Sequence, residues 1–283
     1  MATLHLHPLD NNVQGRLALV TGSSPSSSGG IGSASARALA AEGCDILLHY
    51  SSSKDKAETL AQQLRAQYPS QLFVPVTADL SSRESTRDLV PSALNHASIA
   101  AKHKAISILV ANAGLGRRIR DPKDIGDDDW DEIMEVNARS QFVVVKACLP
   151  GMRAQSWGRV VLVGSIASRG GGINGCHYAA TKGALSSMGL NLATVLAPEG
   201  VTVNTVLPAM IGYTGMIPAP KSMTWTEGAN LEAIKETDLG LGVAAGIPVR
   251  RLGHPDEVAN VVTLFAKTGY MTGQEILLTG GLK

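Results

Sequence analysis

Short apolar segments alternate with longer amphipathic segments along nearly the whole chain, and this alternation restricts the fold more than any other feature. The apolar segments, such as 16–21 (RLALVT) and 159–164 (RVVLVG), have the length of strands and contain almost uninterrupted hydrophobic runs. Strands of this kind are buried on both faces, as in a parallel sheet that helices cover on both sides. The alternation therefore predicts a doubly wound α/β fold, in which ligands bind at the carboxyl ends of the strands.

Residues 1–283 are expected to form a single domain, because the alternation continues without an internal repeat or a linker. Residues 1–14 are expected to form an N-terminal arm before the first strand. The predicted strands are 16–21, 44–50, 72–77, 106–110, 159–164, 201–207 and 274–278. The predicted helices are 31–42, 54–68, 83–104, 127–156, 178–196 and 255–266.

The charge balance argues against a nucleic-acid or membrane partner. The 25 Lys and Arg residues nearly match the 24 Asp and Glu residues, so no overall positive field attracts a polyanion. No apolar run reaches the roughly 18 residues of a membrane span, and the N-terminus lacks the features of a secretion signal. The three cysteines lack metal-ligand spacing and favour free thiols, so we expect a cytoplasmic protein without a metal site.

Tyr178 and Lys182 stand four residues apart on a predicted helix, so their side chains share one face. Ser165 ends a predicted strand. Its hydroxyl, the Tyr178 hydroxyl and the Lys182 ammonium are placed where a single carbonyl oxygen could meet all three. An ammonium beside a phenol should lower the tyrosine pKa from about 10 into a range useful for proton transfer. A Tyr-x-x-x-Lys pair alone is common by chance and more often marks an exposed helix face.

The connection between the first strand and the first helix is rich in glycine and serine, at 20–32 (VTGSSPSSSGGIG). Glycines here allow the backbone to turn tightly and to approach a pyrophosphate, whose charge the helix N-terminus meets. Serine hydroxyls can add hydrogen bonds to a phosphate. The residues expected to contact a dinucleotide in this loop are Gly22, Ser24, Ser28, Gly30, Ile31 and Gly32.

The end of the second strand, at 49–54 (HYSSSK), carries hydroxyls and a lysine but no acid. A carboxylate at this position would take the ribose 2′-hydroxyl of NAD and repel the 2′-phosphate of NADP. Asp45 lies at the opposite end of the strand. We therefore expect Tyr50, Ser51 and Ser52 to contact NADP(H).

With these motifs the chain resembles the short-chain dehydrogenase/reductase family, whose members have a Rossmann fold, over essentially its whole length. The matching residues, in the family's order, are Thr21-Gly22, Gly30-Ile31-Gly32, Asp79-Leu80, Asn112-Ala113-Gly114, Asn137, Ser165, Tyr178, Lys182, Asn204 and Pro208. The likeness is greatest to NADPH-dependent carbonyl reductases and 3-oxoacyl-carrier-protein reductases. Two departures are a phosphate loop four residues longer than usual and Pro208-Ala209 in place of Pro-Gly.

The resemblance implies that Tyr178 is the general acid and that Ser165 hydrogen-bonds the substrate oxygen. It implies that Lys182 holds the nicotinamide ribose and lowers the tyrosine pKa, while Asn137 anchors a water that links Lys182 to solvent. Further cofactor contacts are implied for Asp79, Leu80, Asn112, Ala113, Gly114, Tyr178, Lys182, Pro208, Ile211 and Thr214.

The segment 213–247 is expected to form a mobile substrate lid, because it follows the sixth strand at the edge where a nicotinamide would lie. Its apolar residues suit a bulky or acyl-chain ketone; they are Met216, Ile217, Met223 and Trp225. Alternatively, these residues pack on a neighbouring subunit. The resemblance also implies a homodimer or homotetramer, with candidate interface residues Val143, Val144, Ala147, Met188 and Leu192.

The expected function is the NADPH-dependent reduction of a small-molecule ketone or other carbonyl compound to a secondary alcohol. The enzymatic alternatives are reduction of a 3-oxoacyl thioester and oxidation of an alcohol or a sugar with the same groups. A non-catalytic NADP-binding sensor is a further alternative, because a fold does not fix a function. The presence of Asn137, Ser165, Tyr178 and Lys182 together argues against a sensor.

Overall fold

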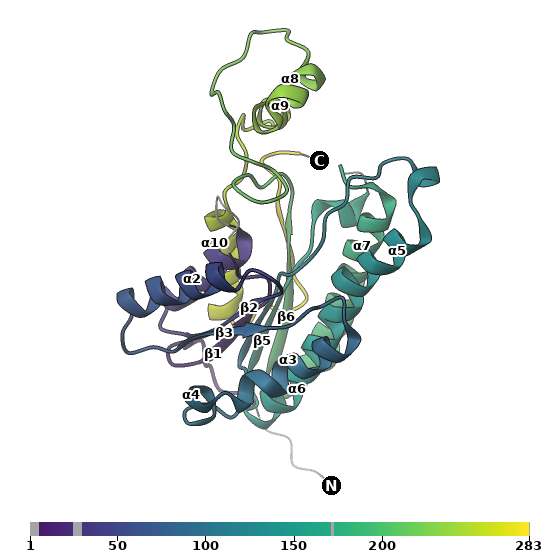
Figure 1. Cartoon of the computed structure of the whole chain (residues 1–283). Helices are drawn as coiled ribbons and strands as arrows, with labels where there is room; N and C mark the ends of the chain where they lie inside the picture. The colour runs from purple at the N-terminus through teal and green to yellow at the C-terminus, as the bar shows by residue number, and fades with distance from the viewer. Residues whose placement is uncertain (1–5, 25–29, 171–172, 283) are drawn as a thin grey trace.

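The computed structural model describes residues 6–24, 30–170 and 173–282, which form a seven-stranded parallel sheet flanked by helices (Figure 1). The strand order is β3-β2-β1-β4-β5-β6-β7, which confirms the doubly wound α/β fold. The strands are β1 (Leu17–Val20), β2 (Asp45–Tyr50), β3 (Phe73–Thr77), β4 (Ile108–Ala111), β5 (Gly158–Val163), β6 (Val201–Pro208) and β7 (Glu275–Leu278).

Helices cover both faces of the sheet, with α1, α2 and α10 on one side and α3, α6 and α7 on the other (Figure 1). The longer helices are α1 (Ile31–Ala41), α2 (Lys54–Gln67), α3 (Arg83–Asn95), α5 (Asp127–Met134), α6 (Ser140–Ala154), α7 (Gly175–Leu196) and α10 (Pro255–Lys267). The shorter ones are α4 (Ala97–Ala100), η1 (Pro122–Asp124), η2 (Glu135–Arg139), η3 (Ile166–Arg169), η4 (Ala197–Glu199), α8 (Leu231–Thr237) and α9 (Leu239–Gly246).

Two hydrophobic clusters, one on each face of the sheet, explain why the strands are apolar throughout. In β1, Ala18 and Val20 belong to the cluster beneath α1, α2 and α10. Leu17 and Leu19 belong to the cluster beneath α3, α6 and α7. Successive side chains of a strand point to opposite faces, so both sets are removed from water.

The strand order reverses beside β1, which pairs with β2 on one side and with β4 on the other. In an open α/β sheet, the loop after one of two such neighbouring strands runs to one face of the sheet, and the loop after the other runs to the opposite face. A crevice forms between these two loops at the carboxyl ends of the strands. This position is where the glycine-rich connection after β1 and the Asn112 segment after β4 come together. The topology therefore places the expected ligand site at the switch between β1 and β4.

Three helical predictions need correction. The predicted helix 83–104 is interrupted at His96, whose backbone is extended, between α3 and α4. The predicted helix 127–156 contains the π-helical turn η2 between α5 and α6. The segment 213–247 contains α8 and α9, which the hydrophobic pattern did not reveal; Asn230 and Asp238 cap their N-termini through side-chain hydrogen bonds.

Asp45 fastens the amino end of the sheet, far from the carboxyl ends. Its buried carboxylate lies 2.6 Å from His103 Nε2 and 2.8 Å from Lys102 Nζ, and it accepts a hydrogen bond from the Leu72 N–H at 2.7 Å. Burial raises the pKa of Asp45, but these hydrogen bonds together hold it below its ordinary value. Asp45 thus joins β2 to the starts of β3 and β4 and takes no part in ribose binding.

Replacing Asp45 with Asn should lower the free energy of unfolding at pH 7 by about 2 kcal/mol, because charge-assisted hydrogen bonds to a buried group are lost. Since the folded-state pKa is lowered, the stabilisation is complete above the unfolded-state pKa of about 4 and disappears as the pH falls through the folded-state value. Urea unfolding at several pH values measures both effects. The control is Glu42→Gln, which breaks a surface ion pair with Lys267 and should cost less than about 1 kcal/mol. Equal losses in the two variants would contradict the role of Asp45.

Candidate active site

A cavity of about 690 Å³ lies at the carboxyl ends of the strands. Its size is within the range of small-molecule and cofactor sites. Residues predicted from the sequence that line it are Gly22, Ser24, Gly30, Ile31, Ser51, Asp79, Leu80, Asn112, Ala113, Gly114, Ser165, Tyr178, Lys182, Pro208, Ile211 and Thr214. The structure does not bring Gly32, Tyr50, Ser52 or Asn137 to the lining, and Ser28 lies outside the described residues.

Ser165 and Tyr178 meet inside this cavity. Ser165 caps η3, and its hydroxyl oxygen accepts a hydrogen bond from the Ala167 N–H at 3.2 Å. The hydroxyl proton remains available towards Tyr178, whose pKa the neighbouring Ser165 side chain lowers. Burial raises the pKa of Tyr178, and the effect of Ser165 opposes that rise only in part. The phenol is therefore held in its protonated form at neutral pH.

Lys182 is buried beside this pair. Its Nζ donates a hydrogen bond to the Val163 carbonyl at 2.9 Å and lies 5.6 Å from the centroid of the Tyr178 ring. Burial lowers the pKa of Lys182 to about 8. Burial has the largest effect on the pKa of each group, and the lowering of the Tyr178 pKa by Lys182 stays a prediction.

Asn137 holds the backbone of the segment after β4. Its Oδ1 accepts a hydrogen bond from the Leu115 N–H at 2.7 Å, and its Nδ2 donates to the Leu115 carbonyl at 2.8 Å. Asn137 lies in η2, and a side chain at Gly114 would come within 3.1 Å of its Oδ1. The structure thus places Asn137 next to the cavity, while its relay of water to Lys182 stays a prediction.

The glycine-rich connection is anchored to the segment after β4. Thr21 Oγ1 accepts hydrogen bonds from the N–H groups of Asn112 at 2.9 Å and Ala113 at 3.0 Å. In return, Asn112 Nδ2 donates to the carbonyls of Thr21 at 2.9 Å and Gly22 at 3.1 Å. A Cβ on Gly32 would lie 2.2 Å from the Gly22 carbonyl oxygen, so Gly32 is required for close packing rather than for ligand contact.

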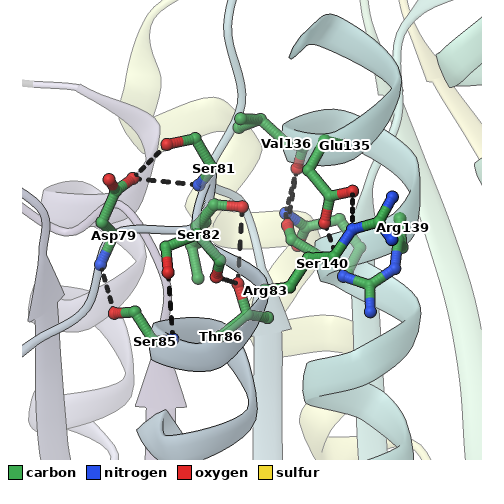
Figure 2. A network of polar contacts seen from close by, with 12 residues as sticks. Asp79, Ser81, Ser82, Arg83, Ser85, Thr86, Glu135, Val136, Arg139 and Ser140 are labelled. Carbon is green, nitrogen blue, oxygen red and sulfur yellow. Dashed lines mark hydrogen bonds and ion pairs between the residues drawn. The ribbon is translucent and has the colours of Figure 1, made fainter. Parts of the chain in front are cut away.

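The turn after β3 is held by its own polar groups, as Figure 2 shows. The Asp79 carboxylate accepts hydrogen bonds from the Ser81 hydroxyl at 2.7 Å and the Ser81 N–H at 2.9 Å, which lower the pKa of Asp79. Arg83 and Arg139 both pair with Glu135 (Figure 2), and these contacts join the start of α3 to η2. The turn that is expected to flank an adenine is therefore tied to the helix that carries Asn137.

The end of β2 differs from the prediction in one respect. Ser51 and His49 line the cavity, whereas Tyr50 and Ser52 do not. Side chains alternate along a strand, so residues 49 and 51 share one face and residue 50 takes the other. The same alternation is the signal that could have identified His49, which the sequence analysis did not select.

The remaining end of the cavity is largely apolar and is formed by segments far apart in sequence. Thr214, Met216 and Ile217, which follow β6, face the Leu115 segment that follows β4. Arg118 joins the two segments through a hydrogen bond from its Nη2 to the Met216 carbonyl at 2.7 Å. Sequence analysis missed several residues of this lining, namely Ser81, Leu115, Gly116, Glu132, Val136, Val163, Gly164, Ala209 and Gly215.

Two absences hold for the part of the chain that the structure describes. None of its helices combines the length and the apolar character that crossing a membrane requires. No three His, Cys, Asp or Glu side chains gather there in an arrangement that could hold a metal ion.

Comparison with known proteins places the chain among oxidoreductases. A family model described as short chain dehydrogenase matches residues 16–223. The chain is 32% identical over 278 residues to the 3-oxoacyl-acyl-carrier-protein reductase FabG of Escherichia coli, with 96% of this chain and 98% of that protein covered. It is 31% identical over 269 residues to the acetoacetyl-CoA reductase of Allochromatium vinosum, with coverage of 94% and 98%.

A similar solved structure is that of a blue fluorescent protein from a metagenomic library in complex with NADPH. It superimposes with a TM-score of 0.78 at 30% sequence identity and covers 95% of this chain and 98% of its own. YwfH, described as an NADPH-dependent reductase involved in bacilysin biosynthesis, gives a TM-score of 0.79 at 21% identity over 95% of this chain and 98% of its own. The second likeness concerns the fold alone.

Proposed function

The chain belongs to the short-chain dehydrogenase/reductase family, and we propose that it reduces a ketone to a secondary alcohol with NADPH. The observation that carries this function is the buried Tyr178 phenol, which lines one cavity together with Ser165 and Lys182. The relatives named above are reductases of 3-oxoacyl and acetoacetyl thioesters, and one similar structure holds NADPH.

The residues present fit a dinucleotide. The cavity extends from Gly22 and Gly30 past Asp79 to Tyr178, at the carboxyl ends of the strands, where dinucleotides bind in doubly wound folds. Ser24 Oγ is buried in the phosphate loop and has no hydrogen-bond partner among the described residues, so a phosphate oxygen would satisfy it. Gly22, Gly30 and the N-terminus of α1 would hold the pyrophosphate, and Lys182 the nicotinamide ribose.

When bound, NADPH supplies a hydride for the carbonyl carbon of the substrate. Ser165 donates a hydrogen bond to the substrate oxygen and so orients the carbonyl group. Tyr178 transfers its phenolic proton to the same oxygen as negative charge develops there. One hydride and one proton thus convert the ketone to a secondary alcohol, and Lys182 stabilises the phenolate that remains.

The protonation state of Tyr178 is compatible with the role of a general acid in reduction. A phenol whose pKa is raised by burial is a proton donor at neutral pH, as reduction requires. Oxidation of an alcohol would need the phenolate. A 3-oxoacyl thioester is the second candidate substrate, supported by the 32% identity to the E. coli enzyme. A non-catalytic sensor would not need the Ser165–Tyr178 contact.

The Tyr178→Phe variant should lose turnover by about 10²–10⁴-fold, because a positioned acid contributes this factor. NADPH binding should change little, since the ring and Lys182 remain. Absorbance at the NADPH band with a ketone and thioester panel measures turnover, and fluorescence titration measures binding. Tyr270→Phe, at a fully exposed tyrosine, is the control and should keep full activity. Turnover of the Tyr178 variant at the unsubstituted rate would rule out Tyr178 as the acid.

The preference for NADPH over NADH rests on the end of β2. Among the described residues, β2 and the loop after it contribute His49 and Ser51 to the cavity lining. His49 is buried and uncharged, and neither residue is an acid. A 2′-phosphate would therefore meet a hydroxyl rather than a carboxylate. Lys54 follows at the start of α2, where its charge favours an anion.

We expect kcat/KM to be at least about tenfold higher with NADPH than with NADH, from one charge-assisted phosphate contact. Ser51→Asp should move the preference towards NADH, because a carboxylate in the lining repels the 2′-phosphate. Ser52→Asp is the matched control: Ser52 is exposed and outside the lining, so the preference should change much less. Equal efficiency of the unsubstituted enzyme with both cofactors would contradict the proposal.

We propose that the segment 213–247 acts as the substrate lid. Met216 and Ile217 line the cavity, whereas Met223 is 82% exposed and Trp225 stacks against Arg250 at 5.8 Å, outside the lining. Met223 and Trp225 therefore do not line the cavity, and the substrate contacts predicted for them stay predictions. Figure 1 shows α8 and α9 standing clear of the sheet, beyond the carboxyl ends of its strands.

Met216→Ala should change KM and the ranking of ketone substrates by about tenfold for bulky members, because an apolar wall of the cavity is lost. Met223→Ala is the control and should leave the ranking as it is. Light scattering of both variants tests the alternative, in which this segment packs on a neighbouring subunit. A changed assembly with an unchanged substrate ranking for Met216→Ala would contradict the lid.

We propose a homodimer or homotetramer in the cytoplasm. Large apolar side chains on α6 and α7 are partly exposed: Phe142 at 45%, Leu190 at 47% and Val195 at 54%. Of the interface residues predicted from the sequence, Val144 is wrong because it is fully buried in the core, while Val143, Ala147, Met188 and Leu192 are partly exposed. The free thiols of Cys44, Cys148 and Cys176 support a reducing compartment.

A further inference from the structure

His49 makes a specific set of contacts at the end of β2 that the catalytic chemistry does not explain. Its ring is 2% exposed and lies at the wall of the cavity. Nδ1 is 3.0 Å from the Gly22 N–H, which can only donate, and Nε2 is 3.0 Å from the Ala78 carbonyl, which can only accept. These partners require a neutral imidazole with its proton on Nε2. Burial agrees with this state, since it lowers the pKa of His49 to about 4.

The contacts of His49 meet those of Asn112 at one glycine. Asn112 Nδ2 donates to the Gly22 carbonyl at 3.1 Å from the β4 side, while His49 Nδ1 accepts from the Gly22 N–H on the β2 side. The next residue, Ser23, donates to the His49 carbonyl through its N–H at 2.9 Å and its hydroxyl at 3.1 Å. The backbone at Gly22 has φ +64°, so the chain turns sharply at the point where these contacts converge.

The orientation of Gly22 decides how close the first turn of α1 can come. The Gly22 carbonyl oxygen would be 2.2 Å from a Cβ at Gly32, so the two backbones are packed directly against each other. The N-terminus of α1 is the part of the site that meets the pyrophosphate charge. A rotation of the Gly22 peptide would therefore displace the N–H groups on which an anion depends.

We propose that His49 is a positioning residue for NADPH, which acts by accepting the Gly22 N–H at Nδ1. This inference rests on the proposal that NADPH is the cofactor, and it concerns only how the glycine-rich connection after β1 is positioned for NADPH. The competing explanation is that His49 matters only as a tether between β2 and Ala78, through Nε2. The two explanations differ in which ring nitrogen is needed.

Two conservative variants separate the two nitrogens. The Oδ1 of Asn stands as many bonds from Cα as Nδ1 of His, so His49→Asn keeps an acceptor for Gly22 and loses the bond to Ala78. The Nε2 of Gln stands where Nε2 of His does, so His49→Gln keeps the donor for Ala78 and loses the acceptor. Each variant removes one hydrogen bond, so the unfolding temperatures of the two ligand-free proteins should be similar.

The measurement is the Kd of NADPH by fluorescence titration of both variants and of the unsubstituted protein. His49→Gln should raise the Kd by about tenfold or more, because the loop loses the contact that orients it and a partly buried N–H is left without this partner. His49→Asn should stay within about threefold of the unsubstituted protein. In steady state, the KM for NADPH of the Gln variant should rise by a larger factor than kcat falls.

The outcomes distinguish this inference from the proposed function. Weak binding by Gln with near-normal binding by Asn supports positioning through Nδ1. Equally weak binding by both variants, or weaker binding by Asn, overturns it in favour of the Ala78 tether. Normal binding by both overturns any role of His49 while leaving NADPH as the cofactor. Absence of NADPH binding by the unsubstituted protein overturns the proposed function and this inference together.

Discussion

The hydrogen bonds between Thr21 and Asn112 hold the two strands at which the order of the sheet reverses. Thr21 Oγ1 accepts two N–H groups from the segment after β4, and the Asn112 side chain returns two hydrogen bonds to the backbone after β1. Without these bonds the two loops would diverge, because their helices pack on opposite faces of the sheet. The loop that leads to α1 and the segment that carries Gly114 are therefore fixed to each other where they leave the sheet, and the cavity opens between them.

Burial drives the two titratable groups of the site in opposite directions, and both shifts favour neutral forms. It raises the pKa of Tyr178 and lowers the pKa of Lys182 to about 8. An ammonium–phenolate pair is therefore not the resting state, and the proton stays on the oxygen that must donate it. Ribose hydroxyls near Lys182 would stabilise its charged form by hydrogen bonding, which would in turn ease formation of the phenolate after proton transfer. In the proposed mechanism, one buried ammonium thus couples cofactor binding to proton transfer.

The sequence was sufficient for the sheet because each strand is buried on both faces, and its observed strands lie within about two residues of the predicted bounds. The motifs likewise predicted that Ser165, Tyr178 and Lys182 lie close together, and all three line one cavity. The position of a residue in the sequence does not show which way its side chain points: Tyr50 does not line the cavity, while His49, which was not predicted, is at its wall. The prediction for Val144 also failed, since the inward side of an apolar helix is set by packing and not by composition. Helices α8 and α9 were missed because their caps, not a hydrophobic stripe, define them.

The segment 213–247, which we propose as a lid, lies between two unusual backbone conformations, at its first residue and three residues after its last. Tyr213 at one end and Arg250 at the other both have φ +57°, a left-handed conformation that is rare for side chains of this size. Between them, Ile217, Val243, Ala244 and Ile247 form a small cluster with Leu252 that is separate from the two clusters of the sheet. Met210 and Leu282, which also lie outside the segment, pack against this cluster, so the cluster joins the segment to the end of β6 and to the C-terminal region. The bond from Arg118 to the Met216 carbonyl then acts across the mouth of the cavity, where closure over a bound ketone would exclude water from the transfer.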